Sequence, residues 1–245
     1  MRSKPKQLSG FTLVEISIVM IIIGLLIGGT FGGMKLIENM QVNKTVQDLK
    51  SIESAALTFK DTYGRLPGDM PNTAARLPSC TDAPCATGGN GDRRLDATLA
   101  TSAAIANTNE RFTFWHHLQA TGLLAMDYSN TADMTFGAGQ PSSSLDGGFR
   151  VSDVTANGHG CIASGAWGMG EVFIINDAFS SAAITGPGTI NCSQLRSLDN
   201  KLDDGLPYHG NLMSGWGCSL TTAVCASLPQ YTGGGVGLAV YNARF

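Results

Sequence analysis

Ser-Gly-Phe-Thr-Leu-Val-Glu, at residues 9–15, begins an apolar run that extends to Met34 and decides the fold of the first part of the chain. Between residues 11 and 34 the sequence carries a single charge, Glu15. A helix crosses a bilayer with about 20 consecutive apolar residues, so this run is long enough to span one. Three of the ten residues in front of it are basic. Because basic flanks stay in the cytoplasm, the sequence predicts an inside N-terminus and an exported remainder.

Glu15 is the residue of this run that a membrane disfavours most. A carboxylate inside a span costs about 2.5–3.5 kcal/mol on insertion scales and is therefore a functional candidate. No Lys or Arg lies within the span, so a partner for Glu15 has to come from outside it. The alternative is an ordinary signal anchor with a glutamate near the interface, where snorkelling lowers the cost. That alternative requires that the sequence Gly10-Phe11 and the charged Glu15 occur together by chance.

Residues 6–15, Lys-Gln-Leu-Ser-Gly-Phe-Thr-Leu-Val-Glu, resemble the class III leader junction of type IV pilins and type II secretion pseudopilins. The resemblance implies that a prepilin peptidase of the inner membrane cuts after Gly10 and methylates Phe11. It also places Glu15 at the family's acidic fifth mature position, which serves assembly. We therefore expect the partner of Glu15 to be the α-amino group that cleavage creates on Phe11 of a neighbouring copy. The resemblance is close from residue 6 to about residue 66, roughly the first quarter of the chain.

The resemblance implies a structural subunit that polymerises through its N-terminal helix into a pilus or pseudopilus. The implied partners are copies of the chain, other pilins or pseudopilins, the peptidase and the inner-membrane assembly platform. The implied location is the inner membrane, as a single-pass protein with a cytoplasmic N-terminus, and then a periplasmic pseudopilus or a cell-surface pilus. The formal net charge of −3 becomes −6 without residues 1–10, with 13 basic against 19 acidic residues, and argues against nucleic acid as a partner.

Two other functions fit the same sequence. The chain could be a minor pilin or tip adhesin that binds a surface or ligand through its C-terminal domain. It could also be a membrane-anchored exported enzyme, but no Ser, Cys or His motif forms a catalytic constellation. We therefore predict that the chain is not an enzyme.

Glycines recur every fourth residue within the span, at positions 24, 28 and 32 and at positions 29 and 33. Small residues at this spacing let helix backbones approach closely in a membrane or a bundle, whereas a generic span is the alternative. Each glycine costs about 1 kcal/mol against alanine in a helix interior. We interpret the pattern as packing against copies of the chain.

Four segments are predicted: a leader at 1–10, a span at 11–34, an amphipathic helix at 35–63 and a globular domain at 64–245. The amphipathic helix is indicated by apolar residues in steps of three or four: Val42, Val46, Leu49, Ile52, Ala56, Phe59 and Tyr63. A turn-rich surface loop at 68–95, helices at 110–124 and 193–202, and strands at 149–155, 171–176, 236–241 and, more weakly, 183–190 follow. The fold class is α+β, with the long helix packed on an antiparallel sheet as in pilins.

Six cysteines in an exported domain predict disulfides. The short spacings favour Cys80 with Cys85 and Cys218 with Cys225, which leaves Cys161 with Cys192, although six cysteines allow fifteen pairings. A zinc site is the alternative, but neither spacing matches a zinc knuckle and no histidine follows at ligand distance.

Two further patterns concern metals. Residues 201–205, Lys-Leu-Asp-Asp-Gly, resemble a segment found late in many pilin-like proteins, where Asp203 and Asp204 could bind calcium. A helix-ending acidic turn is the alternative, because the full spacing of a calcium loop is missing. His116 and His117 invite a metal hypothesis, but adjacent helical residues point in different directions, so a core or surface role is favoured. No other cofactor is predicted.

Overall fold

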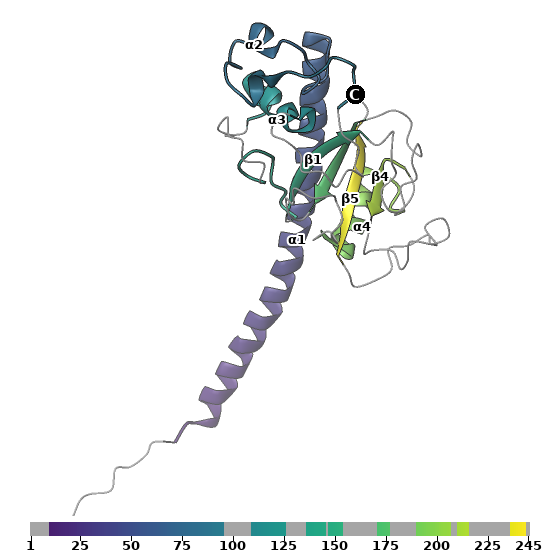
Figure 1. Ribbon diagram of the computed structural model, residues 1–245. Helices are drawn as coiled ribbons and strands as arrows, with labels where there is room; N and C mark the ends of the chain where they lie inside the picture. The colour runs from purple at the N-terminus through teal and green to yellow at the C-terminus, as the bar shows by residue number, and fades with distance from the viewer. Residues whose placement is uncertain are drawn as a thin grey trace, which may run out of the picture. The chain divides into compact units, whose positions relative to one another are not determined.

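The computed structural model describes residues 10–95, 109–125, 136–145, 147–153, 171–176, 190–206, 210–215 and 236–243. The chain divides into two compact units, Met1–Met40 and Gln41–Phe245. One long helix, α1 (Leu13–Tyr63), contributes residues to both units (Figure 1). The long apolar helix and the mixture of helices and strands after it agree with the coarse fold predicted from the sequence.

The part of α1 in the first unit is apolar and exposed. Its most apolar 18-residue window has a mean hydropathy of 2.4, and none of this window is buried. By length and composition α1 can therefore cross a membrane. The helix ends where the sequence predicts: Gly64 has a φ of +70°, and its N–H donates to the Lys60 carbonyl at 2.8 Å. This is a left-handed C-terminal cap, a conformation that glycine adopts at little cost.

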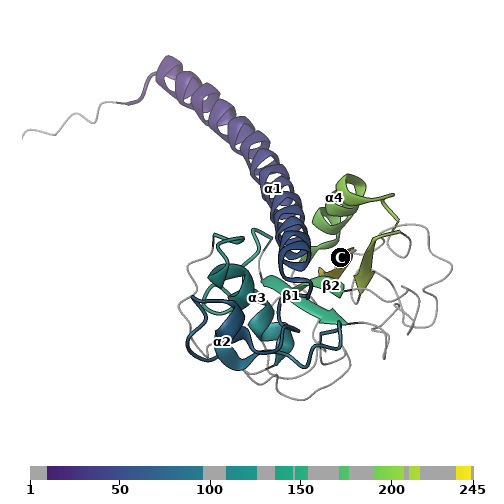
Figure 2. The same ribbon diagram turned by 90° about the horizontal axis from the view of Figure 1, so that it is seen from above.

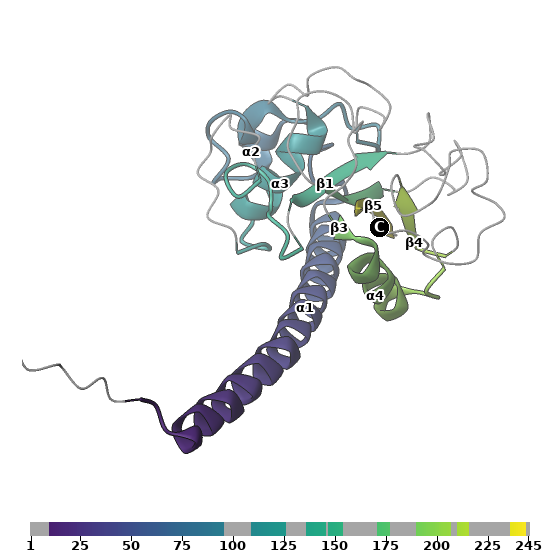
Figure 3. The ribbon, with the colours of Figure 1, turned by 90° about the horizontal axis from the view of Figure 1, so that it is seen from below.

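The part of α1 in the second unit carries the predicted apolar stripe into the core. The buried residues follow one another in steps of one to four: Val42, Thr45, Leu49, Ile52, Ala55, Ala56 and Phe59. Val46 and Tyr63, also predicted, are partly buried against the same core. Figures 2 and 3 show α2 (Thr73–Arg76) and α3 (Glu110–Ala120) on one side of this part of α1, and α4 (Cys192–Leu202) on the other.

Five short strands form the sheet of the second unit. They are β1 (Gly148–Asp153), β2 (Glu171–Asn176), β3 (Ile190–Asn191), β4 (Leu212–Gly215) and β5 (Val236–Ala243). The order is β1-β2-β5-β3, and β4 also pairs with β5. Every pairing among these strands is antiparallel, with Phe173 opposite Tyr241 and Leu212 opposite the same tyrosine. β4 was not predicted from the sequence. Of the strand weakly predicted at 183–190, residues 183–189 lie outside the described residues.

Two predictions need correction in this unit. The helix predicted at 110–124 ends at Ala120, because Gly122 has a φ of +69° and the N–H groups of Leu123 and Leu124 both turn back to the Leu118 carbonyl. The stretch predicted as a surface loop at 68–95 contains α2 and a short 3₁₀ turn, η1 (Cys85–Thr87), and packs into the core. Its buried apolar residues are Met70, Leu77, Cys80, Cys85 and Leu95.

A small polar cluster joins α1 to β5. Lys50 Nζ donates to the hydroxyl of Tyr241 and, at 3.0 Å, to Glu53 Oε2, and the Tyr241 hydroxyl donates to the same carboxylate at 3.2 Å. The ammonium also lies 4.9 Å from the centre of the tyrosine ring. These contacts between Lys50, Glu53 and Tyr241 hold β5 on α1.

We expect Tyr241→Phe to lower the free energy of unfolding by about 1 kcal/mol, because it removes this hydroxyl while Lys50 and Glu53 keep each other. Urea denaturation of the detergent-solubilised chain measures the change. Tyr63→Phe is the matched control, since among the described residues the Tyr63 hydroxyl forms no hydrogen bond. Equal losses in the two variants would contradict the role of the cluster.

Candidate processing and assembly site

The Gly10–Phe11 junction lies in front of the first turn of α1, which begins at Leu13. Both residues are exposed, Phe11 to 84%. A Cβ atom built on Gly10 would meet no atom within 4 Å, and the φ of Gly10 lies outside the left-handed region. The described part of the chain therefore does not require glycine at this position.

Thr12 and Glu15 form a capping box at the start of α1. Glu15 Oε2 accepts a hydrogen bond from the Thr12 backbone N–H at 2.8 Å and one from the Thr12 hydroxyl at 2.8 Å. In return, the Glu15 N–H donates to the Thr12 hydroxyl oxygen at 3.3 Å. Each side chain thus accepts a hydrogen bond from a backbone N–H at the helix N-terminus, where the N–H groups have no partner inside the helix.

Within the described residues, Glu15 has its partners on its own chain. The predicted contact with a neighbouring copy stays a prediction. The pattern Thr-x-x-Glu in front of an apolar run is the signal that could have predicted the box. Both donors bind the same oxygen, and among the described residues Glu15 Oε1 accepts no hydrogen bond. The box therefore leaves one carboxylate oxygen for a second partner.

The glycines of the span have no role within the described chain. A Cβ atom at any of residues 24, 28, 29, 32 or 33 would meet no atom within 4 Å. None of these glycines has a positive φ. Since each weakens the helix by about 1 kcal/mol relative to alanine, the described part of the chain gives no reason to keep them.

Asp203 and Asp204 lie at the end of α4, as predicted, and hold the following loop. Asp203 Oδ2 accepts hydrogen bonds from the backbone N–H groups of Asn211 and, at 3.2 Å, of Leu212, and Asp204 Oδ1 accepts one from Leu206 at 2.8 Å. Carboxylate oxygens of Asp199, Asp203 and Asp204 lie within 4.8 Å of one another. The structure thus assigns Asp203 a structural role, and calcium binding at Asp203 and Asp204 stays a prediction.

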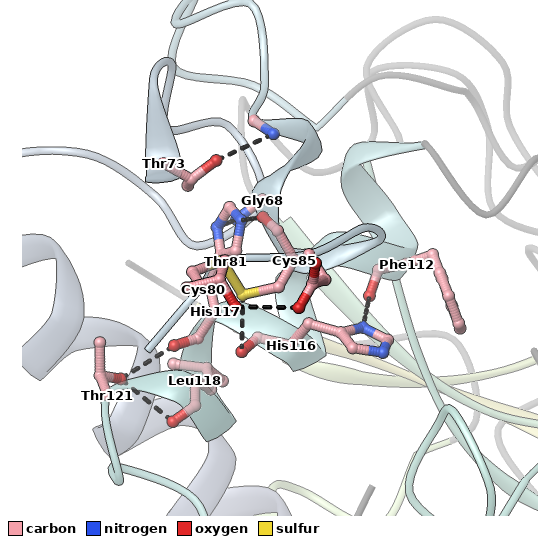
Figure 4. Close-up of a disulfide and its surroundings, with 12 residues drawn as sticks. Gly68, Thr73, Cys80, Thr81, Cys85, Phe112, His116, His117, Leu118 and Thr121 are labelled. Atoms are coloured by element: carbon pink, nitrogen blue, oxygen red, sulfur yellow. Dashed lines mark hydrogen bonds between the residues drawn. A yellow bond between two sulfur atoms is a disulfide. The ribbon is translucent and has the colours of Figure 1, made fainter. Parts of the chain in front are cut away.

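The structure supports the predicted pairing of Cys80 with Cys85, which form a disulfide with 5.3 Å between their Cα atoms (Figure 4). Cys192 is also disulfide-bonded. Its predicted partner, Cys161, lies outside the described residues, and so does the predicted pair of Cys218 and Cys225. Cys80, Cys85 and His117 come close enough together to suggest a metal site. However, sulfur atoms joined in a disulfide are not thiolates, the form that binds zinc.

His117 links the disulfide loop to the end of α1. Its Nδ1 accepts a hydrogen bond from the Gly68 N–H at 2.8 Å, so the ring proton is on Nε2, which donates to the Cys85 carbonyl at 3.1 Å (Figure 4). The side chain is fully buried and stacks on Phe59 with 6.1 Å between ring centres. Burial lowers the pKa of His117 to about 4, so the imidazole is neutral at pH 7. His116 is also buried, and its Nδ1 lies 3.2 Å from the Phe112 carbonyl.

Comparison with known families identifies the N-terminal part of the chain. Residues 6–31 match the family model of the prokaryotic N-terminal methylation motif. The matched range contains the Gly10–Phe11 junction, the capping box and most of the apolar run. Comparisons with curated proteins and with solved structures gave no match.

Proposed function

From the premise that the methylation motif marks the chain as a type IV pilin-like or pseudopilin precursor, we propose that it is a structural subunit. In this proposal the chain is cut after Gly10 and polymerises through α1 into a type IV pilus or a type II secretion pseudopilus. The observation that carries the proposal is the match at residues 6–31, which coincides with the exposed start of an apolar helix.

Processing is supported by the geometry of the Gly10–Phe11 junction. The two residues precede the helix and are exposed, so an enzyme can reach the bond between them. Because the fold leaves room for a side chain at Gly10, the reason for glycine lies outside the chain. A peptidase whose site accepts only the smallest residue before the cut is such a reason.

Assembly is supported by the surface of α1. Its large apolar side chains between Phe11 and Met40 are exposed, and its glycines leave open space. In the membrane this surface faces lipid, and in a filament the same surface would pack against other copies. The free oxygen Oε1 of Glu15 is available to the α-amino group that cleavage creates on Phe11 of a neighbouring copy. Bringing these charges together away from water favours their pairing.

Cleavage after Gly10 and assembly through α1 give each segment of the chain a role in the proposal. Residues 1–10 would be the leader, 11–34 the membrane and assembly helix, 35–63 the helix of the domain, and 64–245 the globular part on the outside. The subunit would wait in the inner membrane with a cytoplasmic N-terminus and move into a periplasmic or surface filament. Its partners would be the peptidase, the assembly platform, and copies of itself or related subunits.

The first test is mass spectrometry of the processed chain. We expect the assembled subunit to begin with N-methyl-Phe11, because the peptidase cuts after Gly10 and methylates the new terminus. Gly10→Val should slow cleavage at least about tenfold, equal to about 1.4 kcal/mol in the barrier. Gly33→Ala, another glycine with open space around it, should be cut at the normal rate. An intact Met1 in assembled material would refute the proposal.

A further inference from the structure

The Cys80–Cys85 disulfide forms part of the wall of a pocket in the second unit. A cavity of 620 Å³ lies between residues 79–85 and the C-terminal end of α3. One side presents Ser79, Thr81, Asp82 and Cys85, and the other side presents Gln119 and Thr121. The size is in the range of small-molecule sites, about 300–1,000 Å³. The rest of the lining comes from His116, Ala120 and Gly122, so polar side chains share the wall with apolar surface and the sulfur.

The two sulfur-bearing residues differ in their access to this pocket. Cys85 lines the cavity and is 6% exposed, whereas Cys80 is 0% exposed and does not line it. We propose that this pocket is a thiol–disulfide exchange site, in which an incoming thiol or disulfide reacts with Cys85 and not with Cys80. The ligand class is a sulfur compound whose remaining atoms are polar, either a small thiol or an extended segment of an oxidoreductase.

The exchange proceeds through a mixed disulfide. In the reductive direction, an incoming thiolate attacks Cys85 Sγ, a new S–S bond forms, and the Cys80–Cys85 bond breaks. The electron pair leaves with Cys80 Sγ, which takes up a proton from water. In the oxidative direction, the Cys85 thiolate attacks the disulfide of the oxidant and expels one of its sulfurs as a thiolate. The Cys80 thiolate then attacks Cys85 Sγ, closes the bridge and releases the second sulfur of the oxidant, now reduced.

Contacts with α3 keep Cys85 in place when the bridge is open. The Cys85 carbonyl accepts the hydrogen bond from His117 Nε2 at 3.1 Å, and Cys85 Sγ lies 3.6 Å from the His116 carbonyl oxygen (Figure 4). The first of these contacts involves the backbone of Cys85, so it does not depend on the disulfide. Cys85 thus stays at the pocket in both oxidation states, which the second half of the exchange requires.

The polar rim explains why a sulfur compound with hydrogen-bonding groups fits better than an apolar one. Thr81 and Asp82 are exposed, and the Thr81 hydroxyl donates to Asp82 Oδ2 at 2.9 Å. The Thr121 hydroxyl is held by the carbonyls of His117 and Leu118 at 2.9 and 3.0 Å. The hydroxyl oxygens and the carboxylate remain acceptors for the N–H groups of peptide-like ligands, among which glutathione is the simplest.

Trapping the mixed disulfide on the full chain tests the proposal. The detergent-solubilised protein is treated briefly with glutathione, quenched with N-ethylmaleimide and mapped by mass spectrometry. We expect glutathione on Cys85 and maleimide on Cys80, in at least about tenfold excess over the reverse arrangement, a ratio that corresponds to 1.4 kcal/mol. A parallel reaction with a thioredoxin variant that retains mixed disulfides distinguishes a small thiol from a protein partner. Reaction at Cys85 in either arm supports the proposal, whereas equal labelling, preference for Cys80 or no reaction of the folded protein in both arms overturns it.

Blocking the pocket provides the control. Ser79 is exposed at the rim, so Ser79→Tyr should obstruct the route and slow the reaction at Cys85 about tenfold. Ser79→Ala should react at the normal rate, because it enlarges the opening. Thr121→Tyr obstructs the same pocket from the opposite side and serves where the first variant is unstable. Normal rates in both tyrosine variants, with unchanged melting temperatures, would show that the pocket is not the route.

Discussion

Replacing Glu15 with leucine is expected to remove the chain from filaments while its insertion into the membrane and the folding of residues 41–245 stay intact. The contact that the proposal assigns to Glu15 lies between subunits, and Glu15 belongs to the first unit and is not a residue of the core of the second. Loss of a buried charge pair at each subunit contact would cost several kcal/mol, enough to abolish assembly. The measurement compares the subunit in a sheared-filament fraction with that in the membrane fraction. Insertion should improve, since the carboxylate costs about 2.5–3.5 kcal/mol in a span.

The capping box requires a control, because Glu15→Leu also removes the cap. Thr12→Val deletes the hydroxyl that caps the helix but keeps the carboxylate of Glu15. A cap contributes about 1 kcal/mol, so this variant should lose far less filament than Glu15→Leu. Equal losses in the two variants would assign the effect to the cap. A normal filament yield from Glu15→Leu would instead indicate a tip or non-polymerising subunit.

Much of the N-terminal quarter of the chain could be predicted from the sequence because its determinants are local. The apolar run predicts the helix, the steps of three and four predict the buried face, and Gly64 predicts the end. The capping box could also be predicted, since Thr12 and Glu15 stand three residues apart at the start of the apolar run. An interpretation that pairs Glu15 only with charged groups does not find the box, because the partners of Glu15 are a hydroxyl and a backbone N–H.

Apart from the Cys80–Cys85 disulfide, the packing of residues 65–95 could not be predicted, because its contacts join distant segments. Asp69 Oδ2 accepts a hydrogen bond from the Arg93 N–H at 2.9 Å, and Glu110 accepts one from Asn90 at 2.7 Å. A Cβ atom on Gly89 would lie 2.4 Å from the Gly68 carbonyl oxygen, so two backbone segments touch there. Turn-forming residues are typical of surface loops, and only the tertiary contacts show that here they permit close packing.

β4 was missed for a similar reason. Leu-Met-Ser-Gly at residues 212–215 shows no alternation and contains no β-branched side chain. It is a strand because β5 offers it a free edge, and because Asp203 fixes its start through the N–H of Leu212. Neither cause is visible in the four residues themselves.

Acid should destabilise the second unit through His117 by about 3 kcal/mol. In the folded chain the pKa of His117 is about 4, against 6.5 as the ordinary value, because the ring is buried. A protonated ring would also bring an N–H on Nδ1 against the Gly68 N–H, which donates to that atom in the folded chain. The unfolded chain therefore binds a proton at a higher pH than the folded chain does.

The sign and the pH range of this effect follow from linkage. Above pH 6.5 both states are neutral at this residue, and the His117 contribution to the free energy of unfolding is complete. Between pH 6.5 and 4 it falls by about 1.4 kcal/mol per pH unit, and below pH 4 it falls no further.

Urea denaturation of the full chain in detergent at pH 7.0, 5.5 and 4.5 measures the loss, with His117→Gln as the control that cannot titrate. We expect this variant to be less stable at pH 7, because Gly68 loses its acceptor, yet to lose less stability than the native chain on acidification. Carboxylates elsewhere titrate in both proteins, so the difference between the two curves isolates His117. Parallel curves would mean that His117 takes up its proton without opening the contact between Gly68, Cys85 and α3.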